Sequence, residues 1–306
     1  MSLTFRNASY LIVSIALFSA IITGCKPGKK ENESDEQEDS TAMVNDQLIK
    51  VNNILFSLPS PIQIAMLIKQ TGANYDRVML NTTKTVPNYT TNFSKALNLG
   101  VYGADMGYVT IYEQTQDALS YMSAIKTLAE SLGIAGSFEK STMDRLEKNI
   151  GIKDSVLAIM TDAFRKSDSY LKSNQRKDIG ALVITGGWIE ALYYATNTAK
   201  KNPHQELVNR IGEQKVTLGN LIKLTTEFGY NEDGTPNKDF SNLANSLIDL
   251  SNLFEGIEFT YTYEKSSIDP ANKVTTINSK SDVKISTKQL SEITEKIKSI
   301  RNQIIK

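Results

Sequence analysis

Two acidic residues stand inside the two most apolar helical stretches of this 306-residue chain. Asp105 lies within the stretch 100–112, and Glu190 lies within the stretch 179–195. A buried carboxylate is costly unless hydrogen bonds or a cation compensate it. Two such acids in one site can orient a ligand or act as general acid and base. Asp105 and Glu190 are therefore the candidate catalytic residues.

Tyrosines accompany both acids and are the candidate ligand-binding residues. Tyr108 follows the first acid by three positions, Tyr112 ends the same stretch, and Tyr194 follows the second acid by four. The functional interpretation is a polar pocket lined by aromatic rings. The structural alternative, which we favour, is a pair of core carboxylates held by tyrosine hydroxyls, by Lys126 or by Arg145.

The remaining composition excludes several kinds of chemistry. The chain has one Cys and one His, which excludes disulfide frameworks and multi-His or multi-Cys zinc sites. It contains no glycine-rich phosphate loop, no Gly-x-Ser-x-Gly elbow and no His-Glu-x-x-His motif. We expect no metal and no cofactor. The 34 basic and 34 acidic residues give no net positive charge, so we expect no nucleic-acid partner.

The single Cys ends an export-like segment at the N-terminus. Arg6 precedes an almost wholly apolar run, residues 8–23. The last two residues of the run, Ile and Thr, are followed by Gly24 and Cys25. This ending resembles the lipobox of bacterial lipoproteins. The resemblance implies a signal peptide over 1–24, cleavage after Gly24, and attachment of diacylglycerol and a further acyl chain such as palmitate to Cys25. The alternative is an uncleaved anchor helix with an incidental Cys.

A polar segment follows the cysteine and predicts a tether over 25–42. Residues 26–41 include three lysines and six acids but no aliphatic or aromatic side chain apart from the ring of Pro27. Such a segment cannot bury enough apolar surface to fold, so we expect a disordered spacer. Lysine and clustered acids after Cys25 resemble the surface-export signal of Bacteroidota lipoproteins. The resemblance implies an outer-membrane location, periplasmic or surface-exposed, with the membrane as one partner and an unknown envelope protein or glycan as another.

The rest of the chain, residues 43–306, predicts a mainly α, single multi-helix domain. From Val44 onward the apolar spacing is helical. Glycines in the two apolar stretches, at positions 103, 107, 186 and 187, predict that these helices cross closely there. Expected helices begin at Pro61 and near 91, 115, 139, 154, 176, 203 and 240, with an irregular stretch over 73–91.

The C-terminal part predicts a small β-hairpin near 257–286 and a final helix. Ile257, Phe259, Tyr261 and Tyr263 alternate with polar residues, which indicates a half-buried strand. We expect residues 274–278 to return antiparallel to it, with 283–285 extending the pairing. The final helix carries apolar residues at three- and four-residue spacing, a packing seam, at 290, 293, 297, 300 and 304.

These patterns favour a lipid-anchored, non-enzymatic binding or scaffolding protein of the bacterial envelope. The alternative is an envelope-acting hydrolase that uses Asp105 and Glu190. A third possibility is an assembly subunit that dimerises through the seam over 290–304. A deep pocket holding both acids would favour the hydrolase, and a filled core would favour the binding module.

Overall fold

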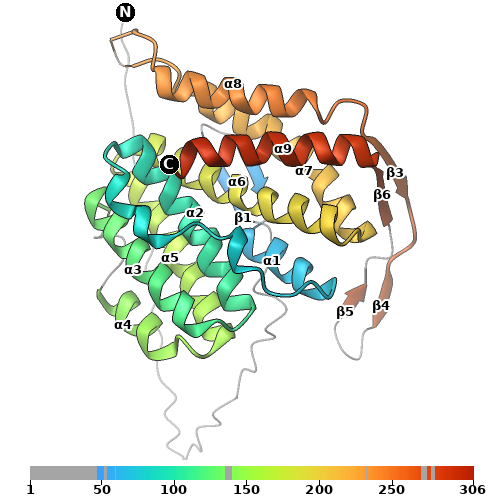
Figure 1. Cartoon of the computed structure of the whole chain (residues 1–306), viewed down its shortest axis with the longest axis horizontal. Helices are drawn as coiled ribbons and strands as arrows, with labels where there is room; N and C mark the ends of the chain where they lie inside the picture. Colours follow the sequence, from blue (N-terminus) through green and yellow to red (C-terminus); the bar gives the residue numbers. More distant parts are fainter. Residues whose placement is uncertain are drawn as a thin grey trace, which may run out of the picture. The chain divides into compact units, whose positions relative to one another are not determined.

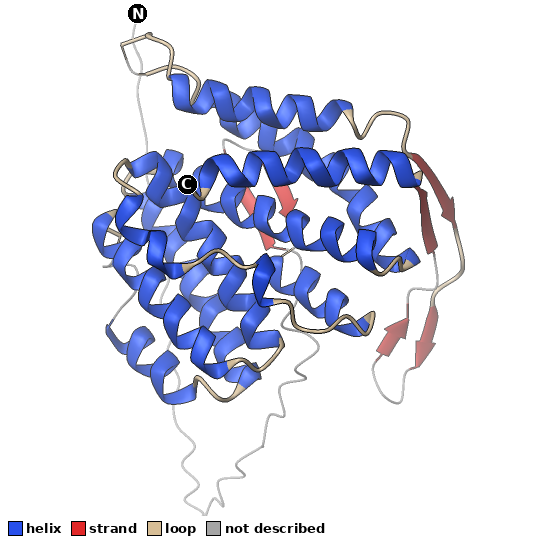
Figure 2. Cartoon of the chain, in the orientation of Figure 1, coloured by secondary structure: helices blue, strands red, loops and turns tan. Residues whose placement is uncertain are grey.

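The computed structural model describes residues 47–51, 54–58, 60–134, 140–231, 233–269, 274–276 and 280–306. These residues are mainly helical, as the sequence predicts, with short two-stranded sheets and a C-terminal helix (Figure 2). The expected signal peptide, the lipid attachment at Cys25 and the tether over 25–42 lie outside the described residues. In the described part of the chain, no helix combines the length and apolar composition needed to cross a membrane.

Two long helices form the centre of the helical body, α2 (Asn92–Ile111) and α6 (Lys177–Lys201) (Figure 1). They approach so closely that glycine is required at the contact. A Cβ on Gly100 would overlap the carbonyl oxygen of Val183, and a Cβ on Gly186 would overlap that of Leu97. The close backbone packing compensates for the low helix propensity of these glycines.

The predicted glycine crossing is therefore confirmed for α6 and is wrong for the residues of α2. Gly100 forms the contact, next to Gly187 of α6. It lies about one helical turn before Gly103 and two turns before Gly107, the glycines predicted from the sequence. Gly107 instead faces Ile62 of a neighbouring helix, whose side chain would lie 3.0 Å from an added Cβ. Gly103 lines an apolar cavity, which is described below.

In the described part of the chain, seven further helices surround or cover α2 and α6, and most begin where the sequence predicts. Helix α1 shows why: Ser60 accepts a hydrogen bond from the N–H of Ile62, Gln63 accepts one from the N–H of Ser60, and Pro61 occupies the first position. Two short 3-10 helices, η1 (Arg77–Met79) and η2 (Thr83–Asn88), occupy the irregular stretch before α2. The bounds are α1 (Pro61–Gln70), α3 (Thr115–Ser131), α4 (Lys140–Asn149), α5 (Lys153–Ser173), α7 (Gln205–Glu227), α8 (Lys238–Asn252) and α9 (Thr287–Ile304).

The apolar seam of α9 packs inside the molecule. Ile293, Ile297 and Ile300 are buried in the same core cluster as α6, and α9 contacts both α6 and α8. The seam is thus a packing face, as predicted, and burial of its first four residues leaves only Ile304 partly exposed. Assembly through this face would require α9 to leave the core.

An antiparallel pair of strands, β1 (Gln47–Val51) and β2 (Ile54–Leu58), precedes α1. The helical interpretation from Val44 onward is wrong here. Both segments are short and rich in Ile, Leu and Val, and short apolar runs of this kind do not distinguish strand from helix by periodicity.

The C-terminal ribbon lies within the predicted range 257–286, but its strand pairing differs from the prediction. Strand β3 (Glu258–Thr262) pairs with β6 (Lys280–Lys284), with Phe259 opposite Val283. Strands β4 (Ser267–Asp269) and β5 (Val274–Thr276) form an inner pair. The predicted pairing of 274–278 with the first strand is therefore wrong for Val274–Thr276, which pair with β4 instead, and residues 277 and 278 lie outside the described residues. Figure 1 shows β3 and β6 beside the end of α9, with β4 and β5 at the far end of the ribbon.

Candidate functional site

The structure places Asp105 in the interior, where protein groups occupy both carboxylate oxygens. Asp105 lies on the buried part of α2 and is inaccessible to solvent. The hydroxyl of Tyr194, on α6, donates to Oδ1, and the backbone N–H of Asn81 donates to Oδ2 at 3.3 Å. The loop before η2 and helix α6 thus meet at this carboxyl group.

Glu190 is equally buried and forms a bidentate ion pair with Arg301 of α9. The guanidinium Nε lies 2.6 Å from Oε2 of Glu190, and Nη2 lies 2.7 Å from Oε1. Nη2 also donates to the carbonyl of Met79 at 2.8 Å, and the guanidinium carbon lies 4.3 Å from the ring centre of Tyr193. This planar, doubly bonded geometry is the strongest form of ion pair that side chains make.

The two acids belong to one electrostatic network. Burial, followed by the negative charge of Glu190, raises the pKa of Asp105 well above its usual range, and the Tyr194 hydrogen bond and the Arg301 charge offset only part of this shift. Burial opposes the charged form of Arg301, yet Glu190 raises the Arg301 pKa above its usual value. Burial and the two nearby acids also raise the pKa of Tyr194. Burial therefore favours the neutral form of Asp105 next to the Glu190–Arg301 ion pair.

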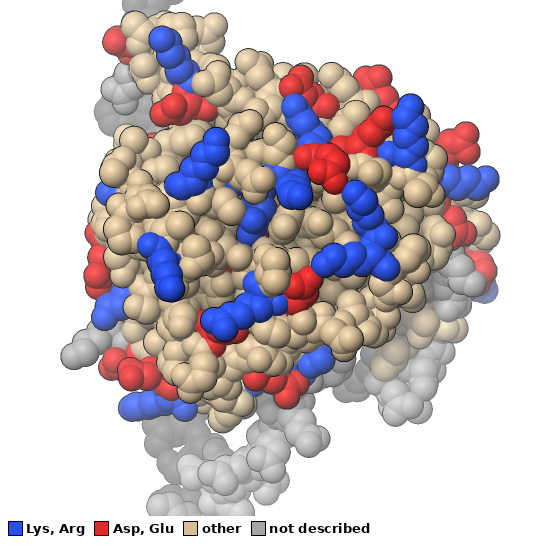
Figure 3. All heavy atoms as spheres, in the orientation of Figure 1, with Lys and Arg blue, Asp and Glu red and all other residues tan. Residues whose placement is uncertain are grey.

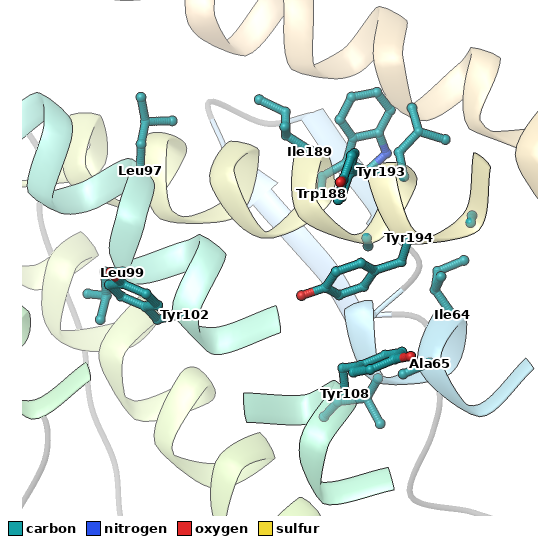
Figure 4. Close-up of a cluster of buried hydrophobic side chains, with 14 of the residues drawn as sticks. Ile64, Ala65, Leu97, Leu99, Tyr102, Tyr108, Trp188, Ile189, Tyr193 and Tyr194 are labelled. Atoms are coloured by element: carbon teal, nitrogen blue, oxygen red, sulfur yellow. The ribbon is translucent and has the colours of Figure 1, made fainter. Parts of the chain in front are cut away.

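The candidate tyrosines contribute to the packed interior, and their hydroxyls bond to the protein itself. The rings of Tyr108 and Tyr194 lie 4.9 Å apart between α2 and α6 (Figure 4). Tyr108 accepts a hydrogen bond from the N–H of Asp76, and Tyr112 donates to the carbonyl of Ala73 at 2.7 Å. Tyr75 stacks beside Tyr108 and donates to Asp117.

The structure therefore brings the predicted site residues together, but as a filled core. Asp105, Glu190, Tyr108 and Tyr194 are all buried, and none of them lines the apolar cavity that the structure contains between α2 and α5. This arrangement matches the structural alternative for the acids, with one correction. The cation is Arg301, because Lys126 and Arg145 are both exposed on the surface.

Sequence reasoning missed Arg301 and Asn81. Arg301 lies four residues after Ile297, on the apolar stripe of α9, and a charged residue on a buried stripe is a signal that it has a buried partner. Asn81 had no such signal. It lies in an irregular segment, where its backbone carbonyl accepts from Tyr121 and its side chain donates to Tyr89 and Asn98.

The C-terminal ribbon presents a second candidate surface, and one of its two edges is closed. On β6, the N–H of Val283 donates to Asn209 of α7 at 2.9 Å, and the carbonyl of Val283 accepts from Gln205 at 3.0 Å. The backbone groups of Val283 therefore point away from β3. In an antiparallel pair the opposite residue does the same, so Phe259 directs its N–H and C=O away from β6. Tyr261, two residues on, shares this orientation.

The other edge, that of β3, has no neighbouring strand among the described residues. Its side chains become more exposed with distance from the helical body: Ile257 is buried, Phe259 is 47% exposed, Tyr261 is 66% and Tyr263 is 74%. The predicted half-buried strand is therefore wrong beyond Ile257, because α7 covers the ribbon only as far as Val283, which packs on Gly212. Aromatic side chains thus lie along β3 together with outward backbone groups that no described strand pairs with.

Charged side chains form no single-sign patch on the face drawn in Figure 3, where basic and acidic residues are interspersed. Several form ion pairs between helices, such as Lys200 with Glu295 and Lys296 with Asp249. Across the described ranges, no group of three or more His, Cys, Asp or Glu side chains is arranged to hold a metal ion. Comparison with protein-family models, curated proteins and solved structures finds no match to this chain.

Proposed function

We propose that this chain is a lipid-anchored, non-enzymatic binding protein of the bacterial envelope, and that it binds an extended segment of a partner protein along β3. The proposal combines the N-terminal sequence, which supports the anchor, with the surface that the ribbon presents. The partner segment adds a strand to the ribbon, and the β3 aromatics provide its apolar contacts.

The observation that carries the proposal is the difference between the two ribbon edges. The β6 edge is closed at Val283 by two side chains of α7. The β3 edge carries outward backbone groups at Phe259 and Tyr261 beside exposed rings. Exposed strand edges pair readily with other chains unless they are blocked. Aromatic residues are also enriched at protein interfaces.

A non-enzymatic role agrees with the state of the two acids. A general acid or base must reach the substrate within hydrogen-bond distance. Asp105 and Glu190 are instead bonded to Tyr194, Asn81 and Arg301 in the interior. Their geometry supports a role in positioning α2, α6 and α9.

The anchor rests on the N-terminal sequence alone, and Cys25→Ser tests it directly. Cells fed an alkyne analogue of palmitate should label the wild-type chain, and the variant should show no label. A variant that keeps the full label would overturn the lipid attachment. Protease treatment of intact cells then distinguishes the surface-exposed from the periplasmic location.

The β3 edge is tested by photo-crosslinking in intact cells, with p-benzoylphenylalanine in place of Tyr263. Tyr261→Pro removes the ring and one outward N–H while leaving the hydrogen bonds toward β6 intact, so the further loss beyond that of Tyr261→Ala measures the N–H. Tyr261→Ala removes the ring alone. Val216→Ala, at an apolar residue of α7 that is 72% exposed, is the matched control.

We expect a discrete protein adduct that falls about tenfold with Tyr261→Pro, falls with Tyr261→Ala and persists with Val216→Ala. Equal adducts in all variants would overturn the proposal. Binding to an envelope polysaccharide that falls equally with Tyr261→Ala and Tyr261→Pro would also overturn it, because loss of the ring would then explain the whole effect without the strand edge.

A further inference from the structure

An apolar cavity of about 40 Å³ lies among α2, α3, α4, α5 and α6, apart from the acid network. Four methionines line it, Met106, Met122, Met143 and Met160, one from each of the first four helices. Ser167 is the one polar side chain in the lining. Water needs two to four polar partners to occupy a cavity, so this lining favours a dry interior.

The size of the cavity limits what it can hold. One water-sized sphere takes roughly 10–15 Å³ of such space, so the cavity has room for about three or four methylene-sized groups. Cavities that bind an aromatic ring are closer to about 150 Å³. The end of an unbranched alkyl chain fits this space, and a ring does not.

Two of the four methionines separate the cavity from solvent. Met122 of α3 and Met143 of α4 are half-buried, so both lie between the cavity and the surface, while Met106 and Met160 are buried. Methionine is unbranched and flexible and adapts to different occupants. Rotation of the Met122 and Met143 side chains would open the cavity toward solvent and let the alkyl chain of a ligand enter there.

A second observation lies beside the cavity on α4. Thr142 is 1% exposed, and its hydroxyl has no hydrogen-bond partner within the described part of the chain. Its neighbour in sequence, Met143, lines the cavity, and so does Leu146, one turn further on. A buried hydroxyl without a partner is costly, and few occur in folded proteins. A polar group brought to α4 would satisfy it.

We propose that this cavity binds a single-chain aliphatic amphiphile, such as a fatty alcohol or fatty acid. The alkyl end occupies the space between α2 and α5, and the polar head lies at α4 within reach of Thr142. The cavity shares no residue with β3 or with the acid network, so this site can be tested independently of the proposed partner binding.

The test is calorimetric titration of the full chain, kept in a steroidal detergent without alkyl chains, with 1-butanol, 1-hexanol and 1-octanol. Affinity should increase about fourfold per added methylene until the cavity is filled. Ala163 lines the cavity on α5, and Ala163→Leu should abolish this binding while the thermal midpoint stays the same or rises. Ala158→Leu, at a half-buried alanine of α5 outside the lining, is the matched control and should bind like wild type.

A milder variant keeps the test informative if Ala163→Leu fails to fold. Val183→Ile adds one methylene to the lining and should weaken 1-octanol binding several-fold. Thr142→Val should weaken 1-octanol binding about tenfold, because the head loses its partner. Equal affinity in wild type, Ala163→Leu and Val183→Ile would indicate surface adsorption and overturn the site. Unchanged affinity in Thr142→Val would overturn the placement of the head.

Discussion

Arg301 of α9 binds Glu190 of α6 through two hydrogen bonds of 2.6 and 2.7 Å, across 111 positions of the chain. Both side chains are buried, and the same guanidinium reaches the carbonyl of Met79 before η2. One side chain therefore ties the C-terminal helix to the central helix and to the irregular segment. The main-chain carbonyl of Ile304, just beyond, is held by Asn98 of α2.

The first prediction concerns this ion pair. Arg301→Met should lower the free energy of unfolding by about 3–5 kcal/mol, because it leaves Glu190 charged and uncompensated in the interior. The double variant with Glu190→Leu should recover most of that loss. Lys296→Met removes one partner of the exposed pair with Asp249 and should cost less than about 1 kcal/mol. Denaturant unfolding measures all three, and an equal loss for Lys296→Met and Arg301→Met would contradict the account.

The second prediction concerns the pH dependence of stability. Because the pKa of Asp105 is raised in the folded protein, its protonated form is favoured there. This contribution is fully present below the unfolded pKa of about 4 and is lost as pH rises through the folded pKa. Asp105→Asn cannot ionise and keeps the shape of the neutral acid. Its stability relative to wild type should therefore increase as the pH rises above about 4.

The control for the second prediction is Asp249→Asn, which removes a negative charge from an exposed ion pair. Its stability relative to wild type should not increase over the same range. Parallel curves for wild type and Asp105→Asn would show that Asp105 is ionised in the folded protein throughout, contrary to the inference from burial and from Glu190.

The third prediction concerns the crossing of α2 and α6. Gly186→Ala should destabilise the protein by about 3 kcal/mol or more, because the new Cβ meets the rigid carbonyl of Leu97. Gly219→Ala is the matched control, since an added Cβ there has no atom within 4 Å. It should stabilise α7 by about 0.5–1 kcal/mol. Thermal unfolding distinguishes the two, and similar effects at both positions would rule out the close crossing.

The fourth prediction concerns the attachment of the ribbon. A Cβ on Gly212 would overlap the side chain of Val283, so Gly212→Ala should push β6 away from α7. Val283→Ala should relieve the overlap, and the double variant should lose less stability than the sum of the single losses by about 1 kcal/mol or more. Strict additivity in a double-mutant cycle would mean that the ribbon does not rest on Gly212.

Much of the helical architecture can be predicted from local signals. Ser60 and Pro61 mark the start of α1, and Gly133, in a left-handed conformation, follows the end of α3. These signals lie within a few residues of the feature they determine. The seam of α9 can be predicted for the same reason. Its apolar spacing is visible within the helix, even though the residues it packs against are distant in the sequence.

The features that could not be predicted depend on distant contacts. The choice of Arg301 over Lys126 as the partner of Glu190 depends on how α9 folds back over α6. The exposure of Tyr261 depends on where α7 stops covering the ribbon, since alternation alone reads the same for a covered and an uncovered strand. Which strand of the ribbon pairs with β3 depends on the register of the pairing. The residues between the strands did not reveal that this strand is β6.

The central claim is that β3 carries the function while the buried acids maintain the core. The most direct test compares Asp105→Asn and Tyr261→Pro in the photo-crosslinking assay in intact cells, with the two variants present at equal levels. The account predicts that Asp105→Asn keeps the partner adduct and that Tyr261→Pro loses it about tenfold. Loss of the adduct in Asp105→Asn together with its retention in Tyr261→Pro would contradict the account.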